Sequence, residues 1–237
     1  MSRLFAIGDI HGCLRLLIRL LDAIVPDIDD CIIFLGDLID RGEDSKGVID
    51  RIISLSNTCQ VFVIMGNHEE MMLISMSDAE TCHLWIGYGG EQALDSFGLP
   101  ATFEGAQQVP LKYQQWLNNL HPYIETKDFI FCHGSPHPNK SIDNQDDAIR
   151  WRKLDLNDAP HVSGKTVICG HSEQLDGDIW QQPHLICIDT FAYGGGNLTA
   201  LEVIDQHTMR AWQVNKDSKE VKISDIVHSI KSRPVTL

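Results

Sequence analysis

The chain has 237 residues, of which 43% are hydrophobic, so it can bury a sizeable core within one compact domain. Its 33 acidic residues outnumber its 19 lysines and arginines, and the formal net charge of −14 excludes a surface that binds nucleic acid through clustered cations. A negative chain can still bind a phosphorylated substrate where metal ions and a few arginines reverse the sign locally.

The cysteines and the apolar runs indicate the compartment. None of the 7 cysteines belongs to a CxxC pair, and most lie in apolar runs such as CIIFLG, as small core residues in a reducing cytoplasm do. Strand-like residues begin at Arg3, which leaves no room for a secretory signal, and no apolar run approaches the ~20 residues of a membrane span. We expect a cytoplasmic protein with no membrane partner, and the sequence does not indicate its oligomeric state.

The first third of the chain alternates between strand-like and helix-like segments. Short apolar runs that end in polar clusters predict strands at 3–7, 31–35 and 60–65. Helix-like segments follow them at 13–24, at 45–56 with Ser45 as the N-cap, and at 69–77. This βαβαβα order predicts a mainly parallel sheet covered by helices.

The rest of the chain divides into a helical part and a strand-rich part. Residues 79–125 predict a helical lobe beside the sheet, and further strands are expected at 128–132, 165–169 and 185–189. Beyond Thr166 strands follow one another, with the glycines at 194–196 as a turn. We expect one domain over residues 1–215 that contains the lobe, followed by a short, charged, peripheral tail at 216–237.

Polar side chains recur where predicted strands end. The clusters are GDIHG at 8–12, GDLIDRG at 36–42, GNHE at 66–69, HG at 133–134 and GH at 170–171. The carboxyl ends of the strands of an open α/β sheet share one edge, so residues distant in sequence converge there. We therefore expect carboxylate, imidazole and amide ligands to meet at one place: Asp9, His11, Asp37, Asn67, His133 and His171.

The residue types of this set favour a pair of metal ions. Six oxygen and nitrogen donors suit two divalent cations such as manganese, iron or zinc better than one tetrahedral zinc, which four ligands would satisfy. A carboxylate can bridge the ions, and Asp37 is the natural bridge. Two ions about 3.5 to 4 Å apart can hold a hydroxide and clamp a phosphoryl group during in-line attack. A lone DxH is more often a turn with a capping aspartate, so the prediction depends on the whole set.

These motifs, in this order, resemble those of the metallophosphoesterase superfamily, and more narrowly the phosphoprotein phosphatase family in its compact bacterial and phage form. The resemblance spans residues 5 to about 203 and includes the closing stretch IDTFAYGGGNLTALEV. It implies an α/β fold of the calcineurin-like kind, with two central mixed β-sheets flanked by helices. It also implies two metal sites, one formed by Asp9, His11 and Asp37 and the other by Asp37, Asn67, His133 and His171, with manganese as the first choice and iron or zinc as alternatives.

The resemblance further implies a general acid. His68 would protonate the leaving alkoxide and would be oriented by Asp40; histidine is also the usual proton donor near neutral pH. Glu69 has a carboxylate at a helix start, where compensation of the helix dipole is the common role, so we leave it outside the catalytic set.

Two arginines are expected to hold the substrate phosphate. Arg41 follows Asp40 in the DRG motif, and its planar fork suits a phosphate. A second arginine is expected after His133, and of the candidates Arg150 and Arg152 the position favours Arg152. The alternative for Arg152 is a surface arginine near the acids at 143–147.

The implied activity is metal-dependent hydrolysis of phosphoserine and phosphothreonine in proteins, extending to phosphotyrosine and small aryl phosphates, by direct attack of a metal-bridging hydroxide. The main alternative is a hydrolase of diadenosine tetraphosphate or another nucleotide polyphosphate, whose relatives often have alanine in place of Asp40 and GNHD in place of GNHE. A more distant alternative is an inactive phosphate-binding protein, although no ligand and no acid is missing from the chain. The HGS at 133–135 departs from the usual HGG or HAG.

Overall fold

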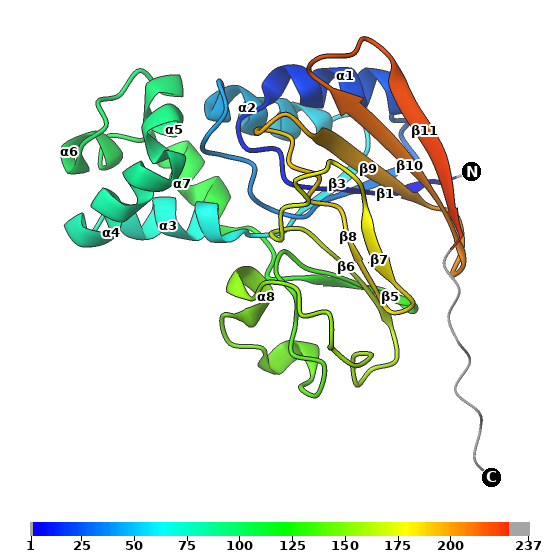
Figure 1. Cartoon of the computed structure of the whole chain (residues 1–237). Coiled ribbons are helices and arrows are strands. Elements are labelled where there is room, and N and C mark those ends of the chain that lie inside the picture. The colour runs from blue at the N-terminus through cyan, green and yellow to red at the C-terminus, as the bar shows by residue number, and fades with distance from the viewer. Residues whose placement is uncertain (1, 228–237) are drawn as a thin grey trace.

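A computed structural model describes residues 2–227 of the chain as two β-sheets packed face to face and flanked by helices (Figure 1). The first sheet contains β1 (Leu4–Ile7), β2 (Cys31–Phe34), β3 (Gln60–Val63), β9 (Asn197–Val203), β10 (Thr208–Asn215) and β11 (Val221–Val227). The second contains β4 (Ile124–Glu125), β5 (Phe129–Phe131), β6 (Thr166–Cys169), β7 (Trp180–Gln182) and β8 (Leu185–Cys187). The helices are α1 (Leu14–Ile24), α2 (Ser45–Leu55), α3 (Asn67–Ser75), α4 (Ala79–Trp85), α5 (Glu91–Ser96), α6 (Phe103–Ala106), α7 (Leu111–Asn118) and α8 (Ala148–Trp151).

Both sheets are mixed, which confirms the expected fold class. The first has the order β11-β10-β9-β1-β2-β3, in which β1, β2 and β3 are parallel and β9 to β11 form an antiparallel meander. The second has the order β4-β5-β6-β8-β7, in which β5, β6 and β8 are parallel and the outer strands β4 and β7 are antiparallel. The prediction of one mainly parallel sheet therefore holds only for the βαβαβα opening, because later strands join it antiparallel.

The layers follow from the alternation of side chains along each strand. In β1, Phe5 and Ile7 pack beneath α1 and α2, whereas Ala6 faces the second sheet. In β5, Phe131 faces the first sheet and Ile130 faces the α8 side. The inner strands β1, β2, β5, β6 and β8 are buried on both faces, which explains their continuous apolar runs.

The helices begin close to their predicted positions, with two shifts. Helix α2 begins at Ser45 as its first residue, and its N-cap is Asp44, whose carboxylate accepts the N–H of Gly47 at 2.7 Å. The hydroxyl of Ser45, which we expected to be the cap, instead accepts the N–H of Asp40 at 2.9 Å. Helix α3 begins at Asn67, two residues before the predicted start, so two of the predicted site residues lie in its first turn.

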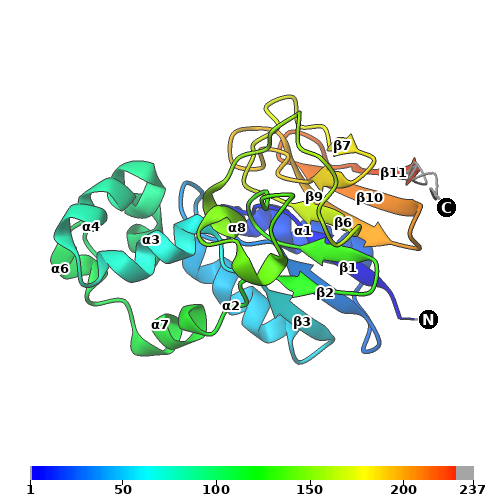
Figure 2. The same ribbon diagram turned by 90° about the horizontal axis from the view of Figure 1, so that it is seen from below.

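The helical lobe, α4 to α7, projects to one side of both sheets, as Figure 2 shows from below. It covers less of the chain than the predicted 79–125, because Ile124–Glu125 forms β4 of the second sheet. No helix within residues 2–227 is long and apolar enough to span a membrane.

The tail expected to be peripheral instead extends the first sheet. Strand β11 pairs antiparallel with β10 from Val221 to Val227, and all of residues 221–226 are exposed or half-buried, as expected for an edge strand. Its charged residues indicated a tail outside the domain. The remaining tail residues, 228–237, lie outside the described residues.

Candidate active site

The carboxyl ends of parallel strands from both sheets meet at one edge of the molecule. In the first sheet β1 leads to Asp9 and His11, β2 to Asp37, and β3 to Asn67. In the second sheet β5 leads to His133, β6 to His171, and β8 to Asp189. All seven side chains are buried, with at most 7% of their surface exposed. A cavity of about 290 Å³ is lined by most of them, including His11, Asp37, Asn67, His171 and Asp189.

Backbone strain is concentrated at this edge. Among the described residues, eight that are not glycine have a positive φ, and five of them are predicted site residues: His11, Asp37, Asp40, Arg41 and His171. A left-handed conformation costs a residue with a side chain about 1–3 kcal/mol. The tight turns that aim these side chains into the cavity are therefore maintained against local preference, as at other functional sites.

Asp37 is at the centre of the arrangement. Its Oδ1 lies 3.2 Å from Nε2 of His133, and its Oδ2 lies 3.5 Å from Nε2 of His11. Burial alone would raise the pKa of Asp37, but the neighbouring His133 and His68 outweigh it and hold the pKa well below its usual range. Asp37 therefore remains a carboxylate and faces both halves of the site, as a bridging ligand must.

Each histidine of the predicted ligand set directs one ring nitrogen toward the other ligands. His11 and His133 donate from Nδ1 to the carbonyl oxygens of Ile39 and Leu35, both at 2.9 Å, which leaves Nε2 facing inward. His171 is held the other way round, with Nε2 donating to a carbonyl at 2.9 Å and Nδ1 left free. Burial lowers the pKa of His171 to about 3, so its ring is neutral. Hydrogen bonds of this kind orient metal-binding imidazoles.

These donors form two groups that share Asp37. One contains Asp37, His133 and His171, and the other contains His11, Asp37 and His68; within each group the ligand atoms lie within 4.8 Å of one another. The amide oxygen of Asn67 joins the first group, 3.0 Å from Nε2 of His133. The second group includes the predicted acid His68 in place of the predicted ligand Asp9.

Asp9 lies at the margin of the donor groups. Its two carboxylate oxygens accept the backbone N–H of His171 at 3.3 and 3.1 Å. A Cβ at Gly170 would collide with Oδ1 of Asp9, so only glycine allows this approach. Burial, together with the nearby charges of Asp189 and Asp37, raises the pKa of Asp9 well above its usual range.

The residues present fit a pair of divalent cations. Three carboxylates, those of Asp9, Asp37 and Asp189, are each at most 2% exposed. Oδ2 of Asp189 is buried without a hydrogen-bond partner, and Asp189 lines the cavity. A buried charge without compensation is costly, and cations bound by oxygen and nitrogen donors would provide that compensation. The shared position of Asp37 is what a two-ion centre requires.

His68 is part of a buried hydrogen-bonded chain. Its Nδ1 lies 2.6 Å from Oδ2 of Asp40, and the same oxygen accepts the indole N–H of Trp85 at 2.8 Å. His68 is 2% exposed and Asp40 is fully buried. Nε2 of His68 is thus directed to the cavity, 3.9 Å from Oδ2 of Asp37. The sequence indicated His68 and Asp40, but nothing marked Trp85, which comes from the helical lobe.

Glu69 has a larger role than the dipole compensation we expected. Its Oε2 accepts the N–H groups of Asp37 and Gly66, both at 2.9 Å. Its Oε1 accepts those of Leu38 at 2.8 Å and Ile39 at 3.4 Å. One fully buried carboxylate therefore ties the start of α3 to the loop after β2 and fixes where Asp37 points.

Arg41 lies at the mouth of the cavity within a small cluster. Its Nη1 donates to Oε1 of Glu173 at 2.9 Å, and its guanidinium carbon lies 4.5 Å from the ring centroid of Tyr193. The hydroxyl of Tyr193 donates to the same oxygen of Glu173 at 2.9 Å. Nη1 of Arg41 is also 3.0 Å from Nε2 of His11, the lone pair that would face an ion. No motif marked Glu173, whereas Tyr193 lies in the closing stretch at 188–203, where no role was predicted for it.

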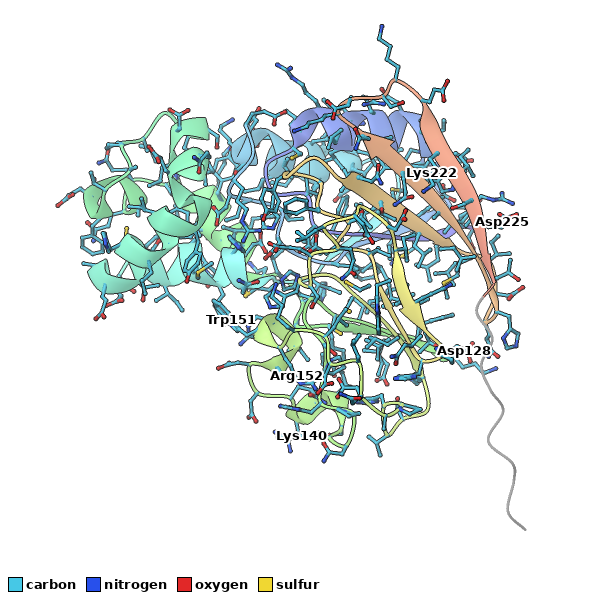
Figure 3. The ribbon with its side chains drawn as sticks, viewed as in Figure 1. Asp128, Lys140, Trp151, Arg152, Lys222 and Asp225 are labelled. Carbon is cyan, nitrogen blue, oxygen red and sulfur yellow. The ribbon has the colours of Figure 1, made fainter. Side chains whose placement is uncertain are left out.

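The second predicted phosphate residue is not at the cavity. Arg152 forms a two-point ion pair with Asp158, at 2.6 and 2.7 Å, and Figure 3 shows it on the far side of α8 from the helical lobe. Arg150 instead pairs with Glu70 at 2.9 Å. Their neighbour Lys153 lines the cavity and donates to the carbonyl oxygen of His171. The structure thus places Lys153, and not Arg152, in the wall of the cavity: α8 ends at Trp151, so the extended residues after it alternate in direction and the one beyond Arg152 faces the site.

The fold and this site define a metallophosphoesterase. The chain matches the calcineurin-like phosphoesterase family over residues 2–215 and belongs to that family. It is therefore a hydrolase of the metallophosphoesterase superfamily, whose members use divalent metal ions, and the donor groups around Asp37 are its candidate metal ligands.

The relatives that the chain resembles include both protein phosphatases and nucleotide tetraphosphatases. The chain is 27% identical over 212 residues to serine/threonine-protein phosphatase 2 of Salmonella typhimurium, covering 84% of this chain and 92% of that protein. It is 44% identical over 70 residues to the symmetrical bis(5'-nucleosyl)-tetraphosphatase of Legionella pneumophila (strain Lens), covering 29% of this chain and 25% of that protein. Coverage of the curated relatives thus ranges from 25% to 92% of their length, with 38% for serine/threonine-protein phosphatase 1 of Salmonella typhimurium.

Solved structures share the fold. The cold-active protein-tyrosine phosphatase of a psychrophilic Shewanella species superposes with a TM-score of 0.69 at 17% identity, covering 93% of this chain and 80% of that chain. At this identity the likeness concerns the fold alone.

Proposed function

We propose that the chain is a phosphomonoesterase that acts on phosphoserine and phosphothreonine in proteins, with phosphotyrosine and aryl phosphates as further substrates. The observation that carries the proposal is the chain from His68 through Asp40 to Trp85. A serine or threonine alkoxide is a poor leaving group that needs a proton as the bond to phosphorus breaks. A phosphatase for such substrates needs a buried, oriented acid at the site.

The charges around His68 favour its acid form. Burial by itself lowers the pKa of His68, but the charges of Asp37 and Asp40 and the hydrogen bond from Nδ1 outweigh it, so the pKa is raised. The carboxylate of Asp40 fixes the ring so that the proton to be donated is on Nε2, the nitrogen directed to the cavity. Trp85 holds Asp40 in turn and keeps this acid in place.

Divalent ions held by the ligand set would supply an activated water and charge stabilisation for the phosphoryl group. Manganese remains our first choice, with iron or zinc as alternatives. Arg41 and Lys153 are the cations among the described residues that line the cavity, so we assign them to the phosphate oxygens. Cytoplasmic location also remains part of the proposal.

The second candidate is a hydrolase of diadenosine tetraphosphate or another nucleotide polyphosphate. The match to symmetrical bis(5'-nucleosyl)-tetraphosphatases favours it. The leaving group of such a substrate is itself a phosphate anion, which departs without a proton and has little need for His68.

Replacement of the acid separates these functions. We expect His68→Asn to lower kcat for a phosphoserine peptide by about 100-fold or more, since general acid catalysis contributes typically 10²–10⁴-fold. Turnover of nitrophenyl phosphate should fall far less, because nitrophenolate leaves readily. Manganese-supplemented assays of the wild-type and variant proteins on both substrates and on diadenosine tetraphosphate measure this.

His83→Asn, in α4, is the matched control and should leave all three rates unchanged. Equal losses on the peptide and on nitrophenyl phosphate would show that His68 positions the phosphate instead of protonating the leaving group. A wild-type protein that prefers diadenosine tetraphosphate over the peptide by ~100-fold, about 2.7 kcal/mol in the transition state, would establish the second candidate.

A further inference from the structure

A second and larger cavity adjoins the candidate active site. Its volume is about 670 Å³, and its walls come from the start of α1, the loop after Arg41, the segment at 192–193, and Lys216. Four of the side chains that line it are cations and one is an acid: Arg15, Arg19, Arg41 and Lys216, against Glu43. We call this the basic cavity. In a chain of net charge −14, such a concentration of positive charge needs an explanation.

Three of these cations carry charge that no carboxylate in the described structure neutralises. Within residues 2–227, no ion pair involves Arg15, Arg19 or Lys216. Arg19 is nevertheless held in place, because its guanidinium donates to the carbonyl oxygens of Asn215 at 2.7 Å and Ser218 at 2.6 Å. These contacts orient the group and leave its charge uncompensated.

The charged residues of α1 are arranged opposite to what the helix dipole favours. The amino end of a helix is partially positive, and acidic residues are favoured there. Helix α1 has no acidic residue in its first turn and no basic residue in its last, and its N-cap Cys13 makes no side-chain cap. It has Arg15 in the first turn and Asp22 near the end. Cys13, Arg15 and Leu16 line the basic cavity, so an uncapped helix end and two helix cations face the same space.

The basic cavity and the candidate active site share a wall. Arg41 lines both cavities. Tyr193 lines the basic cavity, and its hydroxyl donates to Glu173, which lines the catalytic one. A group bound in the basic cavity can therefore belong to the same molecule whose phosphate lies at Asp37 and His68.

We propose that the basic cavity binds a second phosphate group of the substrate, and that the chain therefore prefers phosphopeptides that carry another phosphorylated residue near the one that is hydrolysed. This inference rests on the proposed function. The second phosphate is bound and not cleaved, because the metal-ligand set lies in the other cavity. It contacts Arg15, Arg19 and Lys216 and compensates their positive charge, for which the described structure has no ion-pair partner.

The test compares peptides with one and two phosphoserines. The singly phosphorylated peptide is paired with versions that carry a second phosphoserine two to six residues away on either side. We expect the best doubly phosphorylated peptide to have a kcat/KM about tenfold higher, chiefly through KM, as one added charge-assisted contact would give. Arg15→Gln and Lys216→Gln should each remove most of this preference and leave turnover of nitrophenyl phosphate unchanged.

Arg51→Gln is the matched control, since it removes the same charge from α2, outside the walls of the basic cavity. It should leave the preference within about twofold, because salt screens distant charges. If Arg51→Gln lost the preference for doubly phosphorylated peptides to the same extent, the effect would come from the overall charge of the protein, and the proposal would be overturned. A wild-type protein without the preference, or variants that keep it, would overturn it as well. The proposal would also be overturned if Arg15→Gln and Lys216→Gln lowered the turnover of diadenosine tetraphosphate alone. That result would assign the basic cavity to a nucleotide polyphosphate.

A second measurement does not depend on phosphopeptide turnover. Inorganic tripolyphosphate should inhibit hydrolysis of nitrophenyl phosphate, and Arg15→Gln or Lys216→Gln should raise its inhibition constant about tenfold without changing that of phosphate. Unchanged inhibition constants would overturn the anion site. If the wild-type protein does not hydrolyse the singly phosphorylated peptide, the proposed function fails, and so does the phosphopeptide preference. Changed inhibition constants would in that case still assign an anion to the cavity.

Discussion

The two sheets contribute to the site in different ways. The loops of the first sheet bind one another: the N–H groups of Ile10 and His11 donate to the carbonyl of Asp37 at 3.0 and 2.9 Å, and Glu69 ties the same loop to α3. The second sheet contributes Asp189 and two single histidines, and each histidine ring is fixed by a carbonyl from another segment. His133 is held across the sheet interface by Leu35 of the first sheet.

This difference explains the lengths of the sequence motifs. GDIHG, GDLIDRG and GNHE are long because several residues in each are needed to form the loop network as well as to supply a ligand. HG and GH are short because tertiary contacts do the positioning. We therefore expect changes in the first sheet's loops to affect folding and chemistry together, and changes to the ligand histidines of the second sheet to affect the site alone.

The largest expected effect is at Asp37, which both donor groups share. Asp37→Asn should lower kcat/KM for nitrophenyl phosphate by on the order of 1000-fold, because the two ions lose their common carboxylate. Turnover and metal content per chain, measured after gel filtration in manganese, check this. The exposed Asp22→Asn should retain both. A variant of Asp37 that retains two ions and half of the turnover would refute the central role of this residue.

A smaller effect is expected at Glu69, and it should appear as stability. In Glu69→Gln an amide nitrogen replaces one of two oxygens that accept four backbone N–H groups, so buried donors lose their acceptor. We expect the free energy of unfolding to fall by about 2–3 kcal/mol, measured by urea denaturation, together with weaker metal binding.

Glu70→Gln is the matched change one residue along α3. The side chain of Glu70 is 22% exposed and pairs with Arg150, so its loss should cost less than about 1 kcal/mol. Similar losses of stability in the two variants would show that the hydrogen bonds of Glu69 to the loops of the first sheet stabilise the fold no more than a surface ion pair does.

The smallest expected effect separates two neighbours on the side of the second sheet. Lys153→Ala should lower kcat/KM by about tenfold, because a cation that faces the phosphate is lost. Arg152→Ala should leave kcat/KM within about twofold but lower the free energy of unfolding by about 1–2 kcal/mol, since Asp158 loses its partner. The reverse pattern would restore Arg152 as the phosphate residue and show that its pairing with Asp158 opens when substrate binds.

The sequence by itself determined the local part of this protein. Apolar runs predicted the strands, the polar clusters after them predicted the site residues, and their position at the strand ends predicted that these side chains would meet. These signals are readable because a strand or helix buries its residues with a fixed period, and a turn needs particular residues at particular places.

Only the tertiary structure decided the pairings between segments. The division of the ligands between two sheets, the four N–H groups bound by Glu69, the support of Asp40 by Trp85, and the pairing of Arg152 with Asp158 all join residues with no shared local pattern. Strand β11 belongs to the same class, since its place at the sheet edge depends on β10. The physical reason is that a charged side chain can satisfy its charge with whichever partner the packing brings near, so its sequence neighbours do not identify that partner.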